Sequence, residues 1–200
     1  MKIASRSVGW NMVEAVERDE KSDRAVAVGI DDGFDLNDAV IVALGCNDKG
    51  AWSSCTEALE AALARFRSEG IDVVARSSWW SSMAWPDPHD PAFLNGVVIV
   101  RTDHDPHSLM AALGRIEDAF GRERSVRNAP RTLDLDLIAY GRLSGDLQGL
   151  ILPHPRAAER QFVMGPIAEI APNWVHPTKR ASAENLGQAA SVGRDAHPLK

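Results

Sequence analysis

The feature that most constrains the fold of this chain is a short alternating run, TLDLDLIAY, at residues 132–140. In a β-strand, successive side chains point to opposite faces of the sheet. The three leucines of the LDLDL segment are therefore expected to face the core, with Asp134 and Asp136 together on the opposite face. The pattern predicts a strand that is buried on one side and carries a pair of carboxylates on the other.

The spacing of the two aspartates suits a metal ion. Residues two apart in a strand lie about 6.5 Å apart, at a rise of about 3.3 Å per residue. Two such carboxylates can share one hard cation or hold a pair of them. Carboxylate oxygens suit Mg²⁺, which keeps several waters and is usually completed by substrate phosphates. Asp134 and Asp136 are therefore candidate metal ligands.

The segment just before this strand, GRERSVRNAPR at residues 121–131, is rich in arginine. Guanidinium groups bind phosphate oxygens with two parallel hydrogen bonds, and metal ions neutralise phosphate charge. Arginines beside a carboxylate pair therefore indicate a polyphosphate site, whose candidate residues are Arg122, Arg124, Arg127 and Arg131. The alternative is a surface strand whose aspartates only pair with neighbouring arginines.

Composition narrows the class of protein. The chain has 200 residues, which suits one domain or one domain with appendages, and a net charge of −6. This charge argues against general nucleic-acid binding, which usually needs a basic surface. No apolar run approaches the roughly 18 residues of a membrane span, and the N-terminus lacks the apolar core of a secretory signal. We therefore expect a cytoplasmic, monomeric protein with small-molecule substrates and with neither nucleic acid nor membrane as a partner.

The chain contains two cysteines, Cys46 and Cys55, and no CxxC motif. A disulfide between them requires favourable geometry, and disulfides are rare in the cytosol. Both residues are expected to be reduced thiols.

Hydrophobic periodicity predicts an α+β fold. The expected elements, in chain order, are a strand at 39–44, a helix at 56–69, a strand at 71–82, a strand at 93–102, a helix from Pro106 to Gly121 and a strand at 132–140. This β-α-β-β-α-β order is that of the ferredoxin-like fold, a mostly antiparallel sheet with helices on one face. Further short helices are expected at residues 157–171, after the last strand.

Two motifs carry a resemblance to a known family. The sequence PRTLDLDLIAYG, followed by LPHPRAAERQFVMGPIAEIAP at residues 152–172, resembles the 6-hydroxymethyl-7,8-dihydropterin pyrophosphokinases of folate biosynthesis. The resemblance extends from about Ala39 to Leu186 and implies the same α+β fold. It divides the chain into an N-terminal extension of unknown role (1–37), a pyrophosphokinase domain (38–186) and a flexible tail (187–200).

The resemblance also implies a reaction. The hydroxymethyl oxygen of the pterin would attack the β-phosphorus of ATP, giving the pterin diphosphate and AMP. Two Mg²⁺ ions on Asp134 and Asp136 would clamp the attacking and leaving oxygens of this in-line displacement. The residues implied to be catalytic are Arg122, Arg131, Asp134 and Asp136, and those implied to bind ATP are Arg122, Arg124, Arg127, Arg131, His154 and Arg160.

The pterin requires a flat apolar slot with a polar group that reads its edge. Asn95 both donates and accepts hydrogen bonds, which suits the mixed edge of a pterin. The residues implied to bind this substrate are Ser82, Met83, Trp85, Phe93, Asn95 and Phe162.

Four positions depart from the family pattern. The family has Gly-Ser-Asn where this chain has Cys46 between Gly45 and Asn47, and some members have tryptophan where it has Asn128. A basic phosphate-contacting position falls on Gly149, and Ile151 replaces a hydroxyl residue. These changes leave open a catalytically impaired nucleotide- or pterin-binding protein of the same fold. A metal-dependent phosphodiesterase or nuclease is a third reading, which the acidic composition disfavours.

Overall fold

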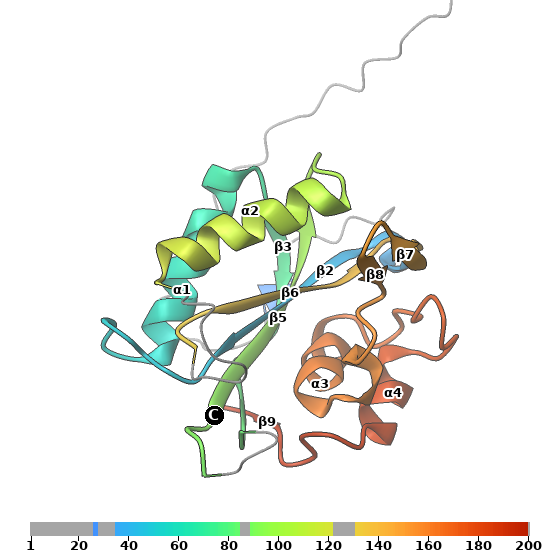
Figure 1. Ribbon diagram of the computed structural model, residues 1–200. Helices are drawn as coiled ribbons and strands as arrows, with labels where there is room; N and C mark the ends of the chain where they lie inside the picture. The colour runs from blue at the N-terminus through green and yellow to red at the C-terminus, as the bar shows by residue number, and fades with distance from the viewer. Residues whose placement is uncertain (1–25, 28–34, 85–88, 122–130, 200) are drawn as a thin grey trace, which may run out of the picture.

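A seven-stranded sheet forms the centre of the computed structural model (Figure 1), which describes residues 26–27, 35–84, 89–121 and 131–199. The strands of this sheet are β1 (Val26–Ala27), β2 (Val40–Cys46), β3 (Asp72–Arg76), β4 (Trp80–Ser82), β5 (Phe93–Arg101), β6 (Asp134–Tyr140) and β9 (His197–Pro198). A separate hairpin consists of β7 (Gly145–Leu147) and β8 (Leu150–Leu152). The helices are α1 (Cys55–Phe66), α2 (Pro106–Ala119), α3 (Gln161–Ile170) and α4 (Ala183–Ala189), with 3₁₀ turns at Leu36–Asp38, Arg67–Glu69 and Ala157–Glu159.

The order of the strands confirms the predicted fold class. The main sheet runs β1-β3-β5-β2-β6 and every registered pair is antiparallel. The predicted second strand, residues 71–82, consists of two strands, β3 and β4, which both pair with β5. Strands β2 and β5 lie in the middle and are buried along nearly their whole length. Their near-continuous apolar sequences fit a position covered on both faces of the sheet.

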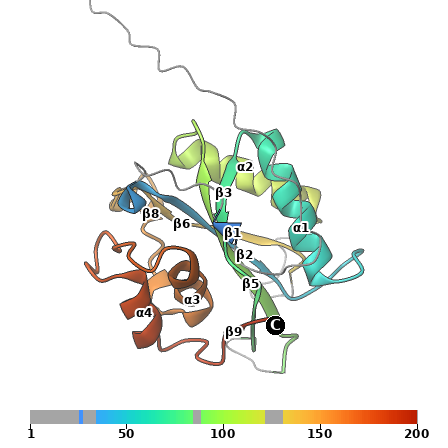
Figure 2. The same ribbon diagram turned by 180° about the vertical axis from the view of Figure 1, so that it is seen from behind.

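Helices α1 and α2 cover one face of the sheet, as Figures 1 and 2 show. The N-terminus of α1 is capped by the Ser54 side chain, which accepts a hydrogen bond from the backbone N–H of Glu57. Asp105 caps α2 in the same way, and Pro106 occupies the first turn, where no N–H is needed. The apolar stripes of both helices, including Phe66 and Leu113, pack into one buried cluster against the sheet.

Helices α3 and α4 cover the opposite face (Figure 2). Met164 and Ile167 of α3 pack with Ile41, Ile99 and the fully buried Trp174 in a second cluster. The chain therefore places helices on both faces, where the ferredoxin-like core alone predicted one. Of the helices in the described part of the chain, none is long and apolar enough to cross a membrane.

The alternation predicted for β6 is confirmed. The leucines at 133, 135 and 137 are buried in the cluster under α1 and α2, whereas Asp134 and Asp136 are partly exposed on the other face. Strand β6 lies at the edge of the sheet, and the buried Glu117 of α2 accepts a hydrogen bond from the backbone N–H of Leu135 at 2.7 Å. This contact fixes the backbone between the two aspartates.

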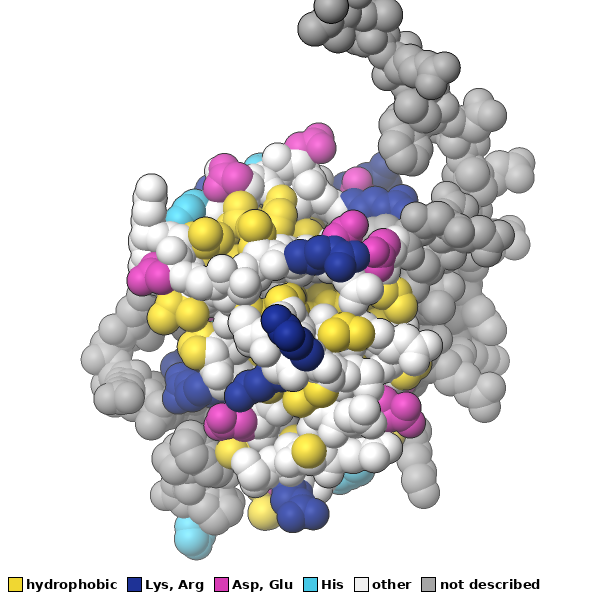
Figure 3. Space-filling model, turned by 90° about the vertical axis from the view of Figure 1, so that its right-hand side faces the viewer, with side chains coloured by type: hydrophobic (Ala, Val, Ile, Leu, Met, Phe, Trp, Pro, Cys, Tyr) yellow, Lys and Arg dark blue, Asp and Glu magenta, His cyan; other side chains and the backbone are white. Residues whose placement is uncertain are grey.

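Charge on the surface is mixed on the side of the molecule that Figure 3 shows. Among the described residues, basic and acidic side chains are interspersed on that face. The arrangement agrees with the net charge of −6.

Both ends of the described chain contact the domain. Residues 26–27 pair with β3, and Arg142 forms ion pairs with Asp35 and Asp38. We expected residues 187–200 to form a flexible tail, but β9 pairs with β4 and Ala196 is buried. The tail is therefore part of the folded structure up to residue 199.

The prediction of two reduced thiols is wrong, because the structure joins Cys46 and Cys55 in a disulfide. Cys46 ends β2 and Cys55 begins α1, and the loop between them brings their Cα atoms to 5.6 Å. This separation falls within the range that a disulfide spans. Sequence spacing does not reveal it, because the return of the loop depends on the packing of α1 on β2.

Reduction of this disulfide is expected to lower the free energy of unfolding by about 2.5 kcal/mol, the loop-closure value for roughly ten residues. Denaturant titrations with and without reductant measure the change, and the Cys46→Ala/Cys55→Ala double variant, which reductant leaves unaffected, is the control. Two titratable thiols in unreduced, denatured protein would contradict the pairing.

Candidate active site

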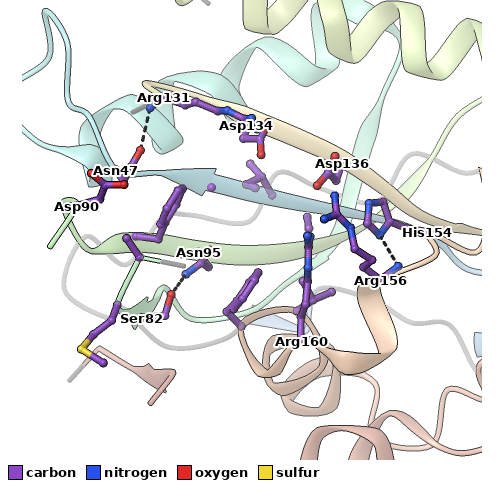
Figure 4. Close-up of a pocket in the computed structure, with 18 residues that line it drawn as sticks. Asn47, Ser82, Asp90, Asn95, Arg131, Asp134, Asp136, His154, Arg156 and Arg160 are labelled. Atoms are coloured by element: carbon purple, nitrogen blue, oxygen red, sulfur yellow. Dashed lines mark hydrogen bonds and ion pairs between the residues drawn. The ribbon is translucent and has the colours of Figure 1, made fainter. Parts of the chain in front are cut away.

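A cavity of about 260 Å³ opens between the sheet and the segment that leads into α3 (Figure 4). Its sheet side comes from β2, β4, β5 and β6, and its other side from residues 154–163. It lies on the face opposite α1 and α2, the face to which the alternation of β6 directs the two aspartates. The residues that line it are Ala43, Leu44, Gly45, Asn47, Ser82, Met83, Ala84, Asp90, Phe93, Asn95, Arg131, Asp134, Asp136, His154, Arg156, Arg160, Phe162 and Val163.

The acidic wall of the cavity consists of Asp134 and Asp136, which project from β6 on the same side (Figure 4). Arg131 Nη1 donates to Asp134 Oδ1 at 2.8 Å. The Arg131 backbone is held by Asn47, whose Oδ1 accepts from Arg131 N at 2.8 Å and whose N donates to Arg131 O at 3.1 Å. The loop after β2 thus fixes the start of the strand that carries both carboxylates.

The opposite wall carries three basic side chains, those of His154, Arg156 and Arg160. The backbone N of Arg156 donates to His154 Nδ1 at 3.3 Å, which leaves the ring proton of a neutral imidazole on Nε2. Burial lowers the pKa of His154, and the neighbouring arginines lower it further against the opposing effect of Asp136. The wall therefore offers the Nε2–H donor of a neutral His154 ring beside the guanidinium groups of Arg156 and Arg160.

Burial and the proximity of Arg156 also lower the pKa of Arg160 from its usual value. Two guanidinium groups that repel each other in a partly buried wall are stabilised when an anion binds in the cavity beside them. The electrostatic design of this wall is that of a phosphate site.

The other end of the cavity is apolar, with one buried amide (Figure 4). Asn95 is 6% exposed, and its Nδ2 donates to Ser82 Oγ at 3.0 Å. Phe93 and Phe162 line the cavity from β5 and the first turn of α3, respectively. A slot with aromatic sides and a fixed amide at its edge fits a flat ring that both donates and accepts hydrogen bonds.

Gly45 forms the floor between these two ends. Its Cβ position would lie 3.8 Å from Asn95 Oδ1, 3.8 Å from Phe93 Cδ1 and 3.9 Å from Asp134 Cβ. The carboxylate wall and the amide are therefore direct neighbours.

The cavity unites ten of the residues expected from the sequence: Ser82, Met83, Phe93, Asn95, Arg131, Asp134, Asp136, His154, Arg160 and Phe162. Trp85, Arg122, Arg124 and Arg127 lie outside the described residues. Gly149 and Ile151, two of the departures from the family pattern, belong to the β7–β8 hairpin and do not line the cavity.

Sequence reasoning missed three polar or charged lining residues, Asn47, Asp90 and Arg156. The sequence position of Asn47 could have indicated its role, because Asn47 directly follows β2, the strand that ends at the site. The position of Arg156 could have done the same, since Arg156 stands two residues after His154 in the PHPR segment. Asp90 lies in a proline-rich segment with no periodic pattern.

The two aspartates fit Mg²⁺ only in the company of a substrate. Among the described residues, no three histidine, cysteine or acidic side chains cluster as a self-sufficient metal site. Mg²⁺ usually takes one or two carboxylates, and water and substrate phosphates complete its octahedron. A carboxylate pair that faces a basic wall across a cavity satisfies this requirement once a polyphosphate is present.

The comparisons with known proteins agree with this geometry. Residues 41–172 match the 7,8-dihydro-6-hydroxymethylpterin-pyrophosphokinase family. A 2-amino-4-hydroxy-6-hydroxymethyldihydropteridine pyrophosphokinase from Synechocystis is 46% identical over 108 residues, which cover 54% of this chain and 55% of the relative. The protein of the same name from Pseudomonas aeruginosa is 36% identical over 160 residues, which cover 80% of this chain and 96% of the relative.

A solved structure described as HPPK-DHPS in complex with substrates has the same fold. It superposes with a TM-score of 0.57 at 13% identity, over 76% of this chain and 43% of the other. The chain thus spans about half the length of the Synechocystis relative and nearly all of the Pseudomonas one. With two thirds of its residues matched to one family, the chain belongs to the 7,8-dihydro-6-hydroxymethylpterin-pyrophosphokinases.

Proposed function

We propose that this chain transfers pyrophosphate from ATP to 6-hydroxymethyl-7,8-dihydropterin, a step of folate biosynthesis. The observation that carries the proposal is that one cavity is lined by a carboxylate pair, three basic side chains, a buried amide and two phenylalanines. The family supports the same reaction. The pterin hydroxymethyl oxygen bonds to the β-phosphorus, the bond from that phosphorus to the α–β bridging oxygen breaks, AMP leaves, and the hydroxyl proton passes to water.

Asp134 and Asp136 are proposed to hold two Mg²⁺ ions against the triphosphate. Bound there, the metal would supply neutralisation of charge on the phosphate oxygens. Arg131 orients Asp134 and lines the same cavity, where it is proposed to contact the same phosphates. This arrangement aligns the attacking and leaving oxygens, which is most of what phosphoryl-type transfer requires of a protein.

The basic wall is proposed to bind the remaining phosphate charge. His154 donates from Nε2, and Arg160 binds as a fork. Arg156, which the sequence did not single out, faces the same cavity and is added to this group. Arg122, Arg124 and Arg127 remain proposed ATP ligands, although they lie outside the described residues.

The amide of Asn95 is proposed to read the edge of the pterin. Ser82 fixes one end of this amide, so the orientation of the side chain exists before substrate arrives. Phe93 and Phe162 then stack against the ring, and Met83, which is 56% exposed, covers the open side. Trp85 remains a proposed contact outside the described residues.

We further propose that the protein acts as a cytoplasmic monomer. The described residues of one chain bring the carboxylate pair, the basic side chains and the buried amide into one cavity, which supports a site formed within a single copy. ATP, the proposed phosphate donor, is a cytoplasmic metabolite.

A coupled assay for AMP tests the proposed function. Purified protein with ATP and Mg²⁺ is expected to release AMP only when 6-hydroxymethyl-7,8-dihydropterin is added. AMP without pterin would indicate a phosphohydrolase instead. No AMP from folded protein that still binds ATP would favour the impaired binding protein.

A further inference from the structure

The C-terminal residues 191–199, here called the strap, lie beyond the segment that matches the family. In Figures 1 and 2 the strap crosses from α3 and α4 to the lower end of the sheet, where β9 lies. It touches two sides of the end of the cavity that is proposed to bind the pterin. One side comes from the end of β4 and the other from the start of α3, which are about eighty residues apart in sequence.

At the start of α3, the strap holds the backbone on both sides of Arg160. The N–H groups of Ser191 and Val192 donate to Glu159 O at 3.1 and 2.9 Å, and Gln161 N donates to Val192 O at 2.8 Å. Arg160 and Val192 form a parallel bridge. The strap thereby fixes the peptide from which the Arg160 side chain enters the cavity.

Gly193 then lies directly against Phe162. A Cβ built at Gly193 would lie 2.4 Å from Phe162 Cδ1 and 3.0 Å from Cε1, so the ring packs on bare backbone. Gly193 also has a φ of +65°, which other residues rarely adopt. The position of the aromatic ring at the cavity therefore depends on the absence of a side chain at residue 193.

At the end of β4, the strap holds the segment that follows this strand. Asp195 Oδ2 accepts a hydrogen bond from Met83 N at 2.5 Å. His197 and Pro198 pair with Ser81 and Trp80, and Leu199 N donates to Trp79 O at 2.8 Å. The backbone that carries Ser82 and Met83 is therefore held at both ends by the same nine residues.

We propose that the strap sets the width of the pterin slot, with Gly193 and Asp195 as positioning residues that act through Phe162 and Met83. The proposal rests on the proposed function, since it assigns the strap to that pterin site. Neither Gly193 nor Asp195 lines the cavity, so each acts on the substrate only through the residue that it holds. Flat-ring binding is sensitive to this spacing, because a gap of even 0.5–1 Å forfeits a quarter to a half of the dispersion energy.

The test measures affinity for 6-hydroxymethyl-7,8-dihydropterin and for ATP separately, by calorimetry and by steady-state KM. Gly193→Ala is expected to displace Phe162 and to raise the Kd and KM for the pterin about tenfold, with KM for ATP changed by less than about twofold. The matched control is Gly145→Ala on the exposed β7. Gly145 has a φ of +121° and nothing within 4 Å of its Cβ position, so this variant carries backbone strain without the steric contact.

Asp195 supplies an independent variant on the surface, where folding is not at risk. Asp195→Ala is expected to raise the Kd for the pterin about threefold, and Asp195→Asn, which keeps an acceptor for Met83 N, to restore it. A pterin Kd that is unchanged in both Gly193→Ala and Asp195→Ala would overturn the strap proposal.

Equal rises in the pterin and ATP constants would also overturn it, because they would show that the strap supports the whole cavity, Arg160 included, rather than the pterin slot. Wild-type protein that binds pterin yet releases no AMP would refute the proposed function and leave the Kd comparison valid. Wild-type protein that does not bind pterin at all would overturn both.

Discussion

Replacement of Asp136 with alanine is expected to lower pterin-dependent AMP formation by about a thousandfold. Asp136 lines the cavity from β6 beside Asp134, and its carboxylate is proposed to hold Mg²⁺ on the phosphates. Metal stabilisation of charge in such a transfer is worth several kcal/mol, and about 4 kcal/mol corresponds to about a thousandfold in rate. Steady-state AMP release as a function of Mg²⁺ concentration measures the loss, together with the Kd for Mg²⁺-ATP, which is expected to rise.

The matched control is Asp72→Ala, which removes an exposed aspartate from β3 of the same sheet. Its activity is expected to stay within about twofold of wild type. The pterin Kd of Asp136→Ala without nucleotide is expected to be unchanged, because the pterin end of the cavity is intact. Retained turnover in Asp136→Ala would remove the metal assignment from β6.

Replacement of Asn95 with alanine is expected to lower kcat/KM for the pterin about a hundredfold. Asn95 is buried and held by Ser82, and its amide is proposed to pair with one donor and one acceptor on the pterin edge. Alanine leaves both pterin groups unpaired on binding, at about 1–3 kcal/mol each, and about 2.7 kcal/mol in total corresponds to a hundredfold change. The Kd for Mg²⁺-ATP is expected to stay within about twofold.

Asn173→Ala, in the exposed turn after α3, is the control for loss of an amide elsewhere. Ser82→Ala is a second variant of the pair, with a smaller expected loss because the Asn95 amide remains but loses its fixed orientation. If Asn95→Ala weakened ATP and pterin equally, the residue would support the fold rather than read the substrate.

The sequence predicted the carboxylate pair well because a strand has a rigid period of two. Leucine at every second position leaves only one face for Asp134 and Asp136, and the structure confirms that face. Phe93 and Asn95, which the resemblance implied, stand two apart in β5, and both line the cavity. Local pattern was sufficient wherever the element itself fixes the direction of the side chain.

The basic wall was only partly predictable. His154 and Arg160 were found through the resemblance, whereas Arg156 was passed over. These residues belong to a turn and a 3₁₀ segment, where no period fixes the direction of a side chain. Their convergence on β6 depends on the packing of α3 against the sheet, which is a tertiary property.

The strap and the disulfide were not predictable for a related reason. Residues 187–200 are small and polar, a composition typical of a frayed end, and the hydrogen bonds that hold them join backbone groups distant in sequence. Cys46 and Cys55 come together only because α1 packs back on β2. Both features are contacts between elements, and single-sequence patterns carry little information about such contacts.

The proposed reaction moves the β- and γ-phosphates of ATP together onto the pterin in this cavity. The direct measurement follows the label from γ-³²P-ATP in the presence of Mg²⁺ and 6-hydroxymethyl-7,8-dihydropterin, with AMP quantified in the same sample. The predicted result is one labelled pterin diphosphate for each AMP, with no ADP. A labelled pterin monophosphate formed together with ADP would contradict it. Label released as free phosphate or pyrophosphate without a pterin product would contradict it as well.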